Sequence, residues 1–329
     1  MSATHREFTA VEANRLDRLV AAELTELSRS QARKLIEGES VTVEGGVVTK
    51  AGHAVAAGAT IEVQLPVVPD LDLLAQDVPL AVLYEDEETL VIDKAPGLVV
   101  HPAPGLDGVT LINVVRARYP EVSEMDDNVR PGVVHRLDRD TSGAMVFAKS
   151  AAAARMLKDQ WRERETLKVY LALADGHVDP PEGIIEAPLG PDPDNLRRRA
   201  VVEDGQSARS QYRVVEHYGD EGTLLEVEIY TGRTHQIRVH LAAIGFPVTG
   251  DTLYGRPSEL IDRQALHAAR LGFTLASTGE WREFKAPIPA DISQAIETLR
   301  ARHGVASATQ PDTTRGRSDS RQGDTVNTS

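Results

Sequence analysis

The sequence contains no cysteine. This absence among 329 residues excludes disulfide frameworks, thiolate zinc sites, iron–sulfur clusters and Cys nucleophiles. It fits a reducing compartment, and we expect a cytoplasmic protein. Long apolar runs are also missing, since none approaches the ~18 residues that a membrane helix requires. The residues after Met1 form no apolar signal segment. We therefore expect neither a membrane partner nor a secretory signal.

Positive charge is scarce as well. Lys and Arg number 36 against 50 Asp and Glu, which gives a net charge of −14. At first sight this total argues against a nucleic-acid partner. The charge is uneven, however: residues 66–130 hold 13 acidic and 4 basic residues, whereas residues 131–170 hold 8 basic and 5 acidic. The average therefore hides a basic region in the middle of the chain.

Length and patterning indicate about two domains. Residues 15–65 read as a small module, with helical spacing over 16–24, a second helix from the capping box Ser28–Gln31 to Gly38, and a tight turn between short strands. We expect residues 1–14 to be an N-terminal extension and residues 66–79, which contain prolines and aspartates, to be a linker. Residues 304–329 are almost free of apolar side chains and predict a disordered tail.

Residues 80–303 predict an α+β domain. Alternating apolar patterns indicate strands at 90–94, 143–148, 167–173, 210–215 and 224–229, and helical patterns cover 151–164 and 235–243. Strands and helices do not alternate regularly. The pattern therefore favours a mixed, largely antiparallel β-sheet with flanking helices over a doubly wound parallel sheet.

The densest polar cluster lies between two apolar runs, at residues 133–143. Asp138 stands between Arg136 and Arg139, whose charges favour its ionised form. A short loop at the end of a sheet is a suitable platform for a catalytic group. A solvated turn with ordinary ion pairs is the alternative at this point.

A second cluster occupies residues 231–240. Thr234 is placed to cap the following helix, and Arg233 lies just before the N-terminus of that helix, where it can meet a carboxylate or a phosphate. An amphipathic helix with a polar face is the alternative. No phosphate-binding loop, dinucleotide fingerprint or G-x-S-x-G elbow occurs. A metal site assembled from His101, His135, Asp138 and His240 stays open.

Several motifs together resemble a known enzyme family. H-R-L-D-x-x-T-S-G at 135–143 is similar to the catalytic signature of the RluA/RluD family of RNA pseudouridine synthases. Further motifs of that family are matched in order at 94–102, 167–173, 231–240, 250–255 and 263–268. The module at 15–65 resembles the small RNA-binding domain first known from ribosomal protein S4. Together the two resemblances cover residues 15 to about 302.

The resemblance implies the conversion of uridine to pseudouridine in RNA, without a cofactor or a metal. It implies Asp138 as the nucleophile, Arg233 as the basic partner of that carboxylate, and Tyr170 as the residue that packs on the base. Large-subunit ribosomal RNA is the expected substrate and transfer RNA the alternative. A non-catalytic ribosome-assembly protein and a metal-dependent phosphoesterase are the competing functions.

The remaining predicted residues bind the substrate. Arg136 matches the side chain that displaces the uridine from the RNA stack, and His101, His135 and Thr141 are predicted to line the substrate site. We also expect the basic run at 197–199 to touch RNA. The chain is expected to be a monomer that needs no nucleotide cofactor. Basic residues on the module's helices are predicted to contact phosphates: Arg15, Arg18, Arg29, Arg33 and Lys34.

Overall fold

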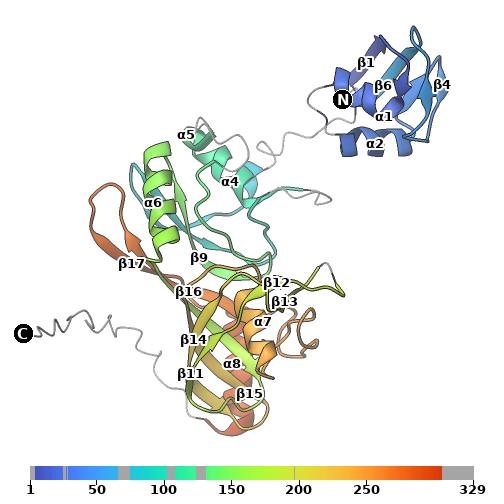
Figure 1. Cartoon of the computed structure of the whole chain (residues 1–329). Coiled ribbons are helices and arrows are strands. Elements are labelled where there is room, and N and C mark those ends of the chain that lie inside the picture. Colours follow the sequence, from blue (N-terminus) through green and yellow to red (C-terminus); the bar gives the residue numbers. More distant parts are fainter. Residues whose placement is uncertain are drawn as a thin grey trace, which may run out of the picture. The chain divides into compact units, whose positions relative to one another are not determined.

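Figure 1 shows a computed structural model of the chain, which describes residues 4–24, 27, 29–65, 75–101, 108–123, 131–195 and 197–305. It divides into two compact units, Met1–Leu71 and Asp72–Ser329. Most of the predicted linker, the predicted capping residue Ser28 and the tail beyond residue 305 lie outside the described residues. Among the described helices, none is both long and apolar enough to span a bilayer.

The first unit is a small α/β module. Helices α1 (Leu16–Glu23) and α2 (Arg29–Glu37) contribute Leu16, Val20 and Ile36 to a core that they share with the sheet. The sheet has the order β1-β6-β3-β4, and a short pair, β2-β5, stands apart from it. The strands are β1 (Thr4–Thr9), β2 (Asn14–Arg15), β3 (Val41–Val43), β4 (Gly46–Val47), β5 (Ala54–Val55) and β6 (Thr60–Leu65).

Strand β1 adds to the predicted module. It pairs with β6 in antiparallel register from Thr4 opposite Leu65 to Thr9 opposite Thr60. Residues 4–9 therefore belong to the sheet, although the sequence prediction had placed them in an extension. Their polar character explains the omission, because most of the strand is exposed and its apolar signal is correspondingly weak.

The second unit is built on a nine-stranded sheet of order β11-β14-β15-β10-β16-β9-β8-β7, with β17 also paired to β16. All pairs are antiparallel except β16 with β9. This arrangement confirms the predicted mixed, largely antiparallel α+β fold. The strands are β7 (Ala81–Glu85), β8 (Thr89–Lys94), β9 (Ser142–Ala148), β10 (Leu167–Asp175), β11 (Glu182–Glu186), β14 (Arg209–Tyr218), β15 (Gly222–Ile229), β16 (Leu266–Thr274) and β17 (Trp281–Lys285).

Helices flank this sheet. The helical elements are η1 (Ala75–Asp77), α4 (Leu111–Arg118), α5 (Pro120–Ser123), α6 (Ala151–Glu163), α7 (Gln236–Ala243) and α8 (Ala290–His303). Helix α6 packs on β9 and β16, and α8 packs on β14. Helix α7 contacts both β14 and a separate hairpin formed by β12 (Leu189–Pro191) and β13 (Arg199–Val201) (Figure 1). Helix α7 begins after His235, so the N-cap is His235 and the predicted cap Thr234 lies one residue before it.

Two features of the central strands position the site. Gly143 lies opposite Ala268 in the parallel pair β9–β16, and a Cβ at Gly143 would come within 2.3 Å of the Ala268 carbonyl oxygen. Glycine therefore lets the two strands approach at the end of the loop that carries Asp138. Strand β10 is buried along nearly its whole length, and it holds Tyr170 in the middle of the sheet.

Candidate active site

The loop that carries Asp138 is fixed by a buried lysine. The Lys94 ammonium donates hydrogen bonds to the carbonyl oxygens of Ala95, Leu98 and Arg139 at 2.8–2.9 Å. Burial lowers the pKa of Lys94 to about 8. The backbone N–H of Thr141 also donates to the Asp138 carbonyl at 3.1 Å. The loop is thus tied to the neighbouring strand and closed on itself, which holds Asp138 in place.

Asp138 is paired with a buried arginine. Nη1 of Arg238, on helix α7, donates to Asp138 Oδ2 at 3.0 Å, while its Nε and Nη2 donate to Asp251 at 2.6 and 2.9 Å. The side chains of Arg238 and Asp251 are 7% and 0% exposed, against 23% for Asp138. Burial opposes the charge of Arg238, but the bonds to Asp251 and the charge of Asp138 outweigh it and raise the arginine's pKa. Arg238 is therefore a fixed cation that leaves part of Asp138 open to the site.

The prediction that Arg233 partners Asp138 is wrong. Arg233 lies before helix α7, and its Nε donates to the Ser207 carbonyl at 3.1 Å. Arg238 takes the predicted place because it lies within the helix, on the side that faces the Asp138 loop and Asp251. The sequence motif contains both arginines, and only the folded helix distinguishes them.

Tyr170 stands beside Asp138 on the sheet. It is 8% exposed, and burial together with the negative charge of Asp138 raises its pKa well above the usual value. The phenol is therefore neutral at physiological pH. It can pack against a planar ring and form hydrogen bonds through its hydroxyl.

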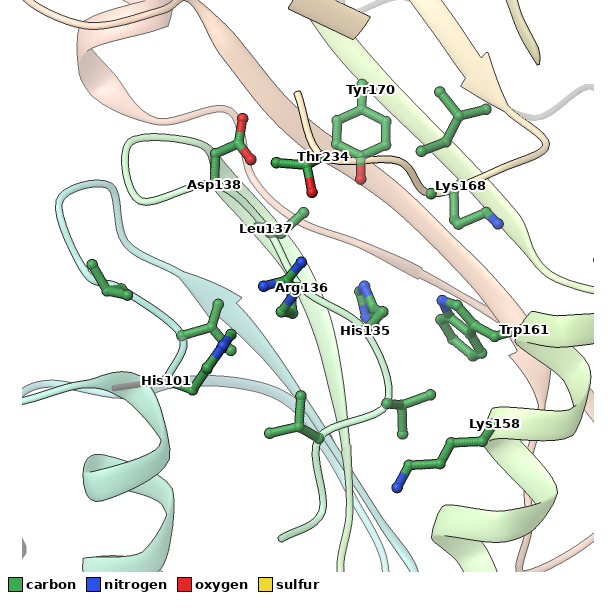
Figure 2. Close-up of a pocket in the computed structure, with 16 residues that line it drawn as sticks. His101, His135, Arg136, Leu137, Asp138, Lys158, Trp161, Lys168, Tyr170 and Thr234 are labelled. Carbon is green, nitrogen blue, oxygen red and sulfur yellow. The ribbon is translucent and has the colours of Figure 1, made fainter. Parts of the chain in front are cut away.

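Asp138 and Tyr170 line a cavity of about 620 Å³ (Figure 2). In this view Asp138, Tyr170 and Thr234 gather at one end. The volume is sufficient for a nucleoside with part of its backbone. The residues around the cavity are Val99, Val100, His101, Val133, Val134, His135, Arg136, Leu137, Asp138, Lys158, Trp161, Lys168, Tyr170, Ile229, Gly232 and Thr234.

Away from Asp138, the cavity is lined by His135, Trp161 and Lys158, and Lys168 lies between Tyr170 and Trp161 (Figure 2). The His135 ring stacks on Trp161 with centroids 4.9 Å apart, and its Nε2 accepts a hydrogen bond from the Val146 N–H at 3.1 Å. Burial lowers the pKa of His135 to about 3 and that of Lys168 to about 8. His135 is thus a neutral wall residue, whereas Lys168 brings a nearly buried amine to the site.

A further group approaches Asp138 from the turn before α7. His235 adopts a left-handed backbone conformation with φ 58°, and its Nε2 lies 4.0 Å from Asp138 Oδ1. Its Nδ1 is 2.8 Å from the Tyr254 hydroxyl. Burial lowers the pKa of His235 despite the nearby carboxylate. The strained backbone is consistent with a residue held in place for function.

The sequence and the fold match known proteins. The family model described as RNA pseudouridylate synthase matches residues 88–243, and the model of the S4 domain matches residues 14–61. An RNA pseudouridine synthase of Chloroflexus aurantiacus is 47% identical over 88% of this chain and 91% of its own. This chain belongs to the RNA pseudouridylate synthase family.

Two other relatives support the assignment of this pseudouridine synthase. Ribosomal large subunit pseudouridine synthase D of Vibrio vulnificus is 38% identical over 87% of this chain and 91% of its own. The structure of human RNA pseudouridylate synthase domain containing 1 superposes with a TM-score of 0.53 at 28% identity, covering 68% of this chain and 95% of the human one. The match to the S4 domain also identifies the first unit as an RNA-binding module.

The predicted substrate residues occupy different positions in the synthase. Arg136 is exposed at the rim of the cavity, and no carboxylate of the described residues forms an ion pair with it. His101 lines the side of the cavity that lies away from Trp161 in Figure 2. Thr141 is 2% exposed, does not line the large cavity, and contributes to a smaller hollow beneath Asp138. Arg136 and His101 can therefore reach an RNA, whereas Thr141 supports the loop.

The predicted RNA-binding arginines of the module are only partly brought together. Arg15, Arg29 and Arg33 line one hollow, where Lys50 joins them. Arg15 and Arg29 both pair with the buried Asp17 at 3.0 and 2.9 Å, and Arg33 pairs with Glu37.

The other two predicted residues of the module, Arg18 and Lys34, are exposed and do not line this hollow. Lys50 was not predicted, because the turn that carries it is distant in sequence from the helices. Its place beside Arg29 and Arg33 is a result of the fold.

Other residues of the site were also missed. Asp251 and Tyr254 belong to the G-D-x-x-Y-G motif, and Arg238 to the T-G-R-T-H-Q-I-R motif. The sequence shows the spacing of these motifs, but it does not show that Arg238 contacts Asp138 and Asp251 in the fold. The metal site considered from the sequence does not form, because His240 is buried against Ser210 and the Ala187 carbonyl. Across the described part of the chain, no cluster of three His, Asp or Glu suits a metal ion.

Proposed function

We propose that this pseudouridine synthase isomerises specific uridines of large-subunit ribosomal RNA in the cytoplasm, without a cofactor. The substrate class is supported by relatives that are named ribosomal large subunit pseudouridine synthase D and match over 87% of this chain. The S4 module supplies a second RNA-binding surface on the same chain.

The observation that carries the mechanism is the Arg238-held carboxylate of Asp138 at the end of a cavity of about 620 Å³. Pseudouridine formation breaks the bond between N1 and C1′ and joins C1′ to C5. The proton leaves C5 and N1 gains one, so the atoms balance without a redox partner. Asp138 acts as the nucleophile that holds the substrate covalently while the base turns. Arg238 keeps the carboxylate aimed, because its other nitrogens are bonded to Asp251.

Tyr170 acts as a neutral phenol in this mechanism. Its raised pKa makes a phenolate base unfavourable at physiological pH. Its ring instead supports the uracil and excludes water from the bond that breaks. The hydroxyl can hold a hydrogen bond to the base during its rotation.

The target base must leave the RNA stack before it can reach Asp138. Extrusion of a base costs roughly a few kcal/mol. Arg136, exposed at the rim of the cavity, can stack in the vacated position and neutralise a nearby phosphate. The exposed position of Arg136 thus supports the proposal that it takes part in base flipping.

Release of tritium from [5-³H]uridine tests the chemistry. We expect the purified protein to release tritium from a 23S ribosomal RNA transcript without added cofactor, and Asp138→Asn to abolish release while RNA binding is retained. Asp140→Asn is the matched control, because Asp140 lies in the same loop but pairs with the exposed Arg139. Equal release by Asp138→Asn and wild type would remove Asp138 from the mechanism.

Mapping pseudouridine in total RNA from cells with and without the gene tests the substrate. We expect sites in large-subunit ribosomal RNA to disappear and to return with the wild-type gene but not with Asp138→Asn. Loss of sites in transfer RNA alone would transfer the proposal to that substrate. An unchanged map, together with no tritium release, would favour a non-catalytic assembly protein.

A further inference from the structure

A second hollow adjoins the active site. It measures about 310 Å³ and lies over the β12–β13 hairpin and the turn before α7. We call it the hairpin groove, and it is lined by Leu189, Gly190, Pro191, Arg199, Asp204, Gly205, Gln206, Arg233 and Thr234. Thr234 also lines the catalytic cavity. A polymer seated in the catalytic cavity can therefore continue directly into the hairpin groove.

The walls of the hairpin groove are firmly built. Gln206 and Leu189 exchange backbone hydrogen bonds at 2.8 and 2.9 Å. A Cβ at Gly190 would come within 2.4 Å of Val202, and one at Gly205 within 2.8 Å of the Leu189 backbone. These two glycines allow the segment after β13 to lie closely against the hairpin. The groove is thus shaped before any ligand arrives, which reduces the entropy lost on binding.

Tyr254 connects the hairpin groove to the catalytic charges. Its hydroxyl accepts a hydrogen bond from the backbone N–H of Arg199 at 2.7 Å and lies 2.8 Å from His235. The guanidinium groups of Arg198 and Arg238 lie 5.2 and 5.1 Å from its ring centre. The position of the hairpin relative to Asp138 is therefore set by direct contacts through one aromatic ring.

Two guanidinium groups give the hairpin groove its chemistry. Among the described residues, no carboxylate forms an ion pair with Arg199 or Arg233. Within the part of the chain that the structure describes, the one hydrogen bond of the Arg233 side chain uses Nε, so its two terminal nitrogens face no described partner and can bind a ligand. Asp204 also lines the groove and disfavours an anion at its own end. None of the lining residues is aromatic, which disfavours base stacking, whereas paired guanidinium groups suit phosphate.

We infer that the hairpin groove binds a backbone phosphate of the RNA, next to the target uridine, through Arg199 and Arg233. The identity of the ligand as RNA rests on the proposed function. The inference also gives Arg233 a role: the arginine that does not reach Asp138 holds the strand that leaves the active site. The neighbouring Arg197 adds a further positive charge to the hairpin, whereas Arg198 pairs with Asp192.

The salt dependence of RNA binding tests this inference. The probe is a fluorescein-labelled 23S ribosomal RNA transcript, bound by the full-length chain between 50 and 300 mM KCl. We expect Arg199→Ala with Arg233→Ala to weaken binding at low salt about tenfold and to reduce the slope of log K against log salt by about 1.4, as two lost single-strand phosphate contacts predict. The double lysine variant should restore the slope but only part of the affinity, because lysine keeps the charge and loses the planar fork.

Arg213→Ala is the matched control. Arg213 is an exposed arginine of the same unit that pairs with Glu226 and lines neither cavity. Its replacement should leave both the slope and the affinity unchanged. Thermal unfolding of each variant shows that the fold is retained. An unchanged slope for the alanine double variant, or an equal loss in the lysine variant, would overturn the inference.

Tritium release separates this inference from the proposed function. For the alanine double variant we expect kcat/KM to fall about tenfold with kcat nearly unchanged, because the groove positions RNA and does not touch the reacting atoms. If the wild-type protein releases no tritium, the proposed function fails. The salt slopes of RNA binding then still show whether the hairpin groove binds phosphate. If the wild-type protein is active and the variant keeps its full kcat/KM, the inference that the groove positions the RNA is overturned, whereas the proposed function stands.

Discussion

Ion pairs in the two units of this chain differ in how far water reaches them. In the synthase unit Arg238 lies between Asp138 and Asp251, with side chains that are 7%, 23% and 0% exposed. In the RNA-binding module Arg33 and Glu37 form a pair on helix α2 whose side chains are 65% and 47% exposed. Water screens the exposed pair and leaves its members free to exchange partners.

The difference corresponds to what each unit must do. A nucleophile works only at a defined position. Asp138, the proposed nucleophile, is held by Arg238, a buried cation whose other nitrogens are bonded to Asp251. A surface that meets many RNA phosphates needs charges that can adjust, and exposed arginines satisfy this need. Under the proposed function, the buried pair fixes the catalytic group, whereas the exposed pair belongs to the predicted RNA-contacting surface.

The largest effect is expected when methionine replaces the buried Arg238, and the same replacement at the exposed Arg33 provides the comparison. Arg238→Met leaves the buried Asp251 and the proposed nucleophile Asp138 without this cation. Breaking a buried pair in this way costs roughly 3–5 kcal/mol of the free energy of unfolding. Tritium release should be lost as well. Arg33→Met removes an exposed partner, and we expect a change within about 0.5 kcal/mol. Chemical denaturation of the two variants measures the contrast.

A second variant separates the two consequences of losing Arg238. In Arg238→Met with Asp251→Asn one uncompensated carboxylate is gone, so part of the lost stability should return. Activity should not return, because Asp138 still lacks the donor that orients it. Recovery of both would mean that Arg238 serves the fold alone, and equal destabilisation by Arg33→Met would remove the contrast between buried and exposed pairs.

An intermediate effect is expected from buried histidines at acid pH. His267 lies within the sheet, with Nδ1 2.9 Å from the Ser142 hydroxyl, and burial lowers its pKa to about 4. The unfolded chain binds this proton near pH 6.5, so between pH 6.5 and 4 the unfolded state holds more protons. Stability is therefore fully present above pH 6.5 and falls as the pH drops, by about 2 kcal/mol at pH 5 from this group.

The variant His267→Gln isolates this contribution. Glutamine can form hydrogen bonds but does not titrate, so the fall in unfolding free energy between pH 6.5 and 5 should be shallower than in the wild type. Parallel pH profiles for the wild type and His267→Gln would show that burial does not keep this ring neutral.

The contrast between buried and exposed charge also explains what the sequence could predict. Asp138 stands out in the sequence as part of a dense polar loop, whereas Tyr170 is predicted only from the resemblance of its motif to the family, and the structure places both at one cavity. Arg238 was missed in favour of Arg233 because the choice depends on which face of α7 meets the Asp138 loop and Asp251. A motif contains the residues, but the contact between distant motifs arises only when the sheet is assembled.

The same limit applies to the module. Helical spacing placed Arg29 and Arg33 on one side of α2, and the structure shows both at one hollow. Strand β1 was missed because its exposed polar residues give little periodic signal. Lys50 was missed because it reaches the hollow from a turn that packs beside Arg15.

The smallest effect is expected in the module, where two pairs of exposed cations can be compared. Arg29→Ala with Arg33→Ala removes two residues of the hollow, whereas Arg18→Ala with Lys34→Ala removes two exposed cations that lie outside it. The first pair should weaken binding of the 23S transcript severalfold and lower the salt slope by about 1.4, as two lost contacts predict. The second pair lies outside the hollow, so its loss should change the slope by less than half as much, although both variants lose the same formal charge. Binding titrations over a range of KCl concentrations compare them, and equal slopes for the two variants would show that overall charge, and not the hollow, directs this module to RNA.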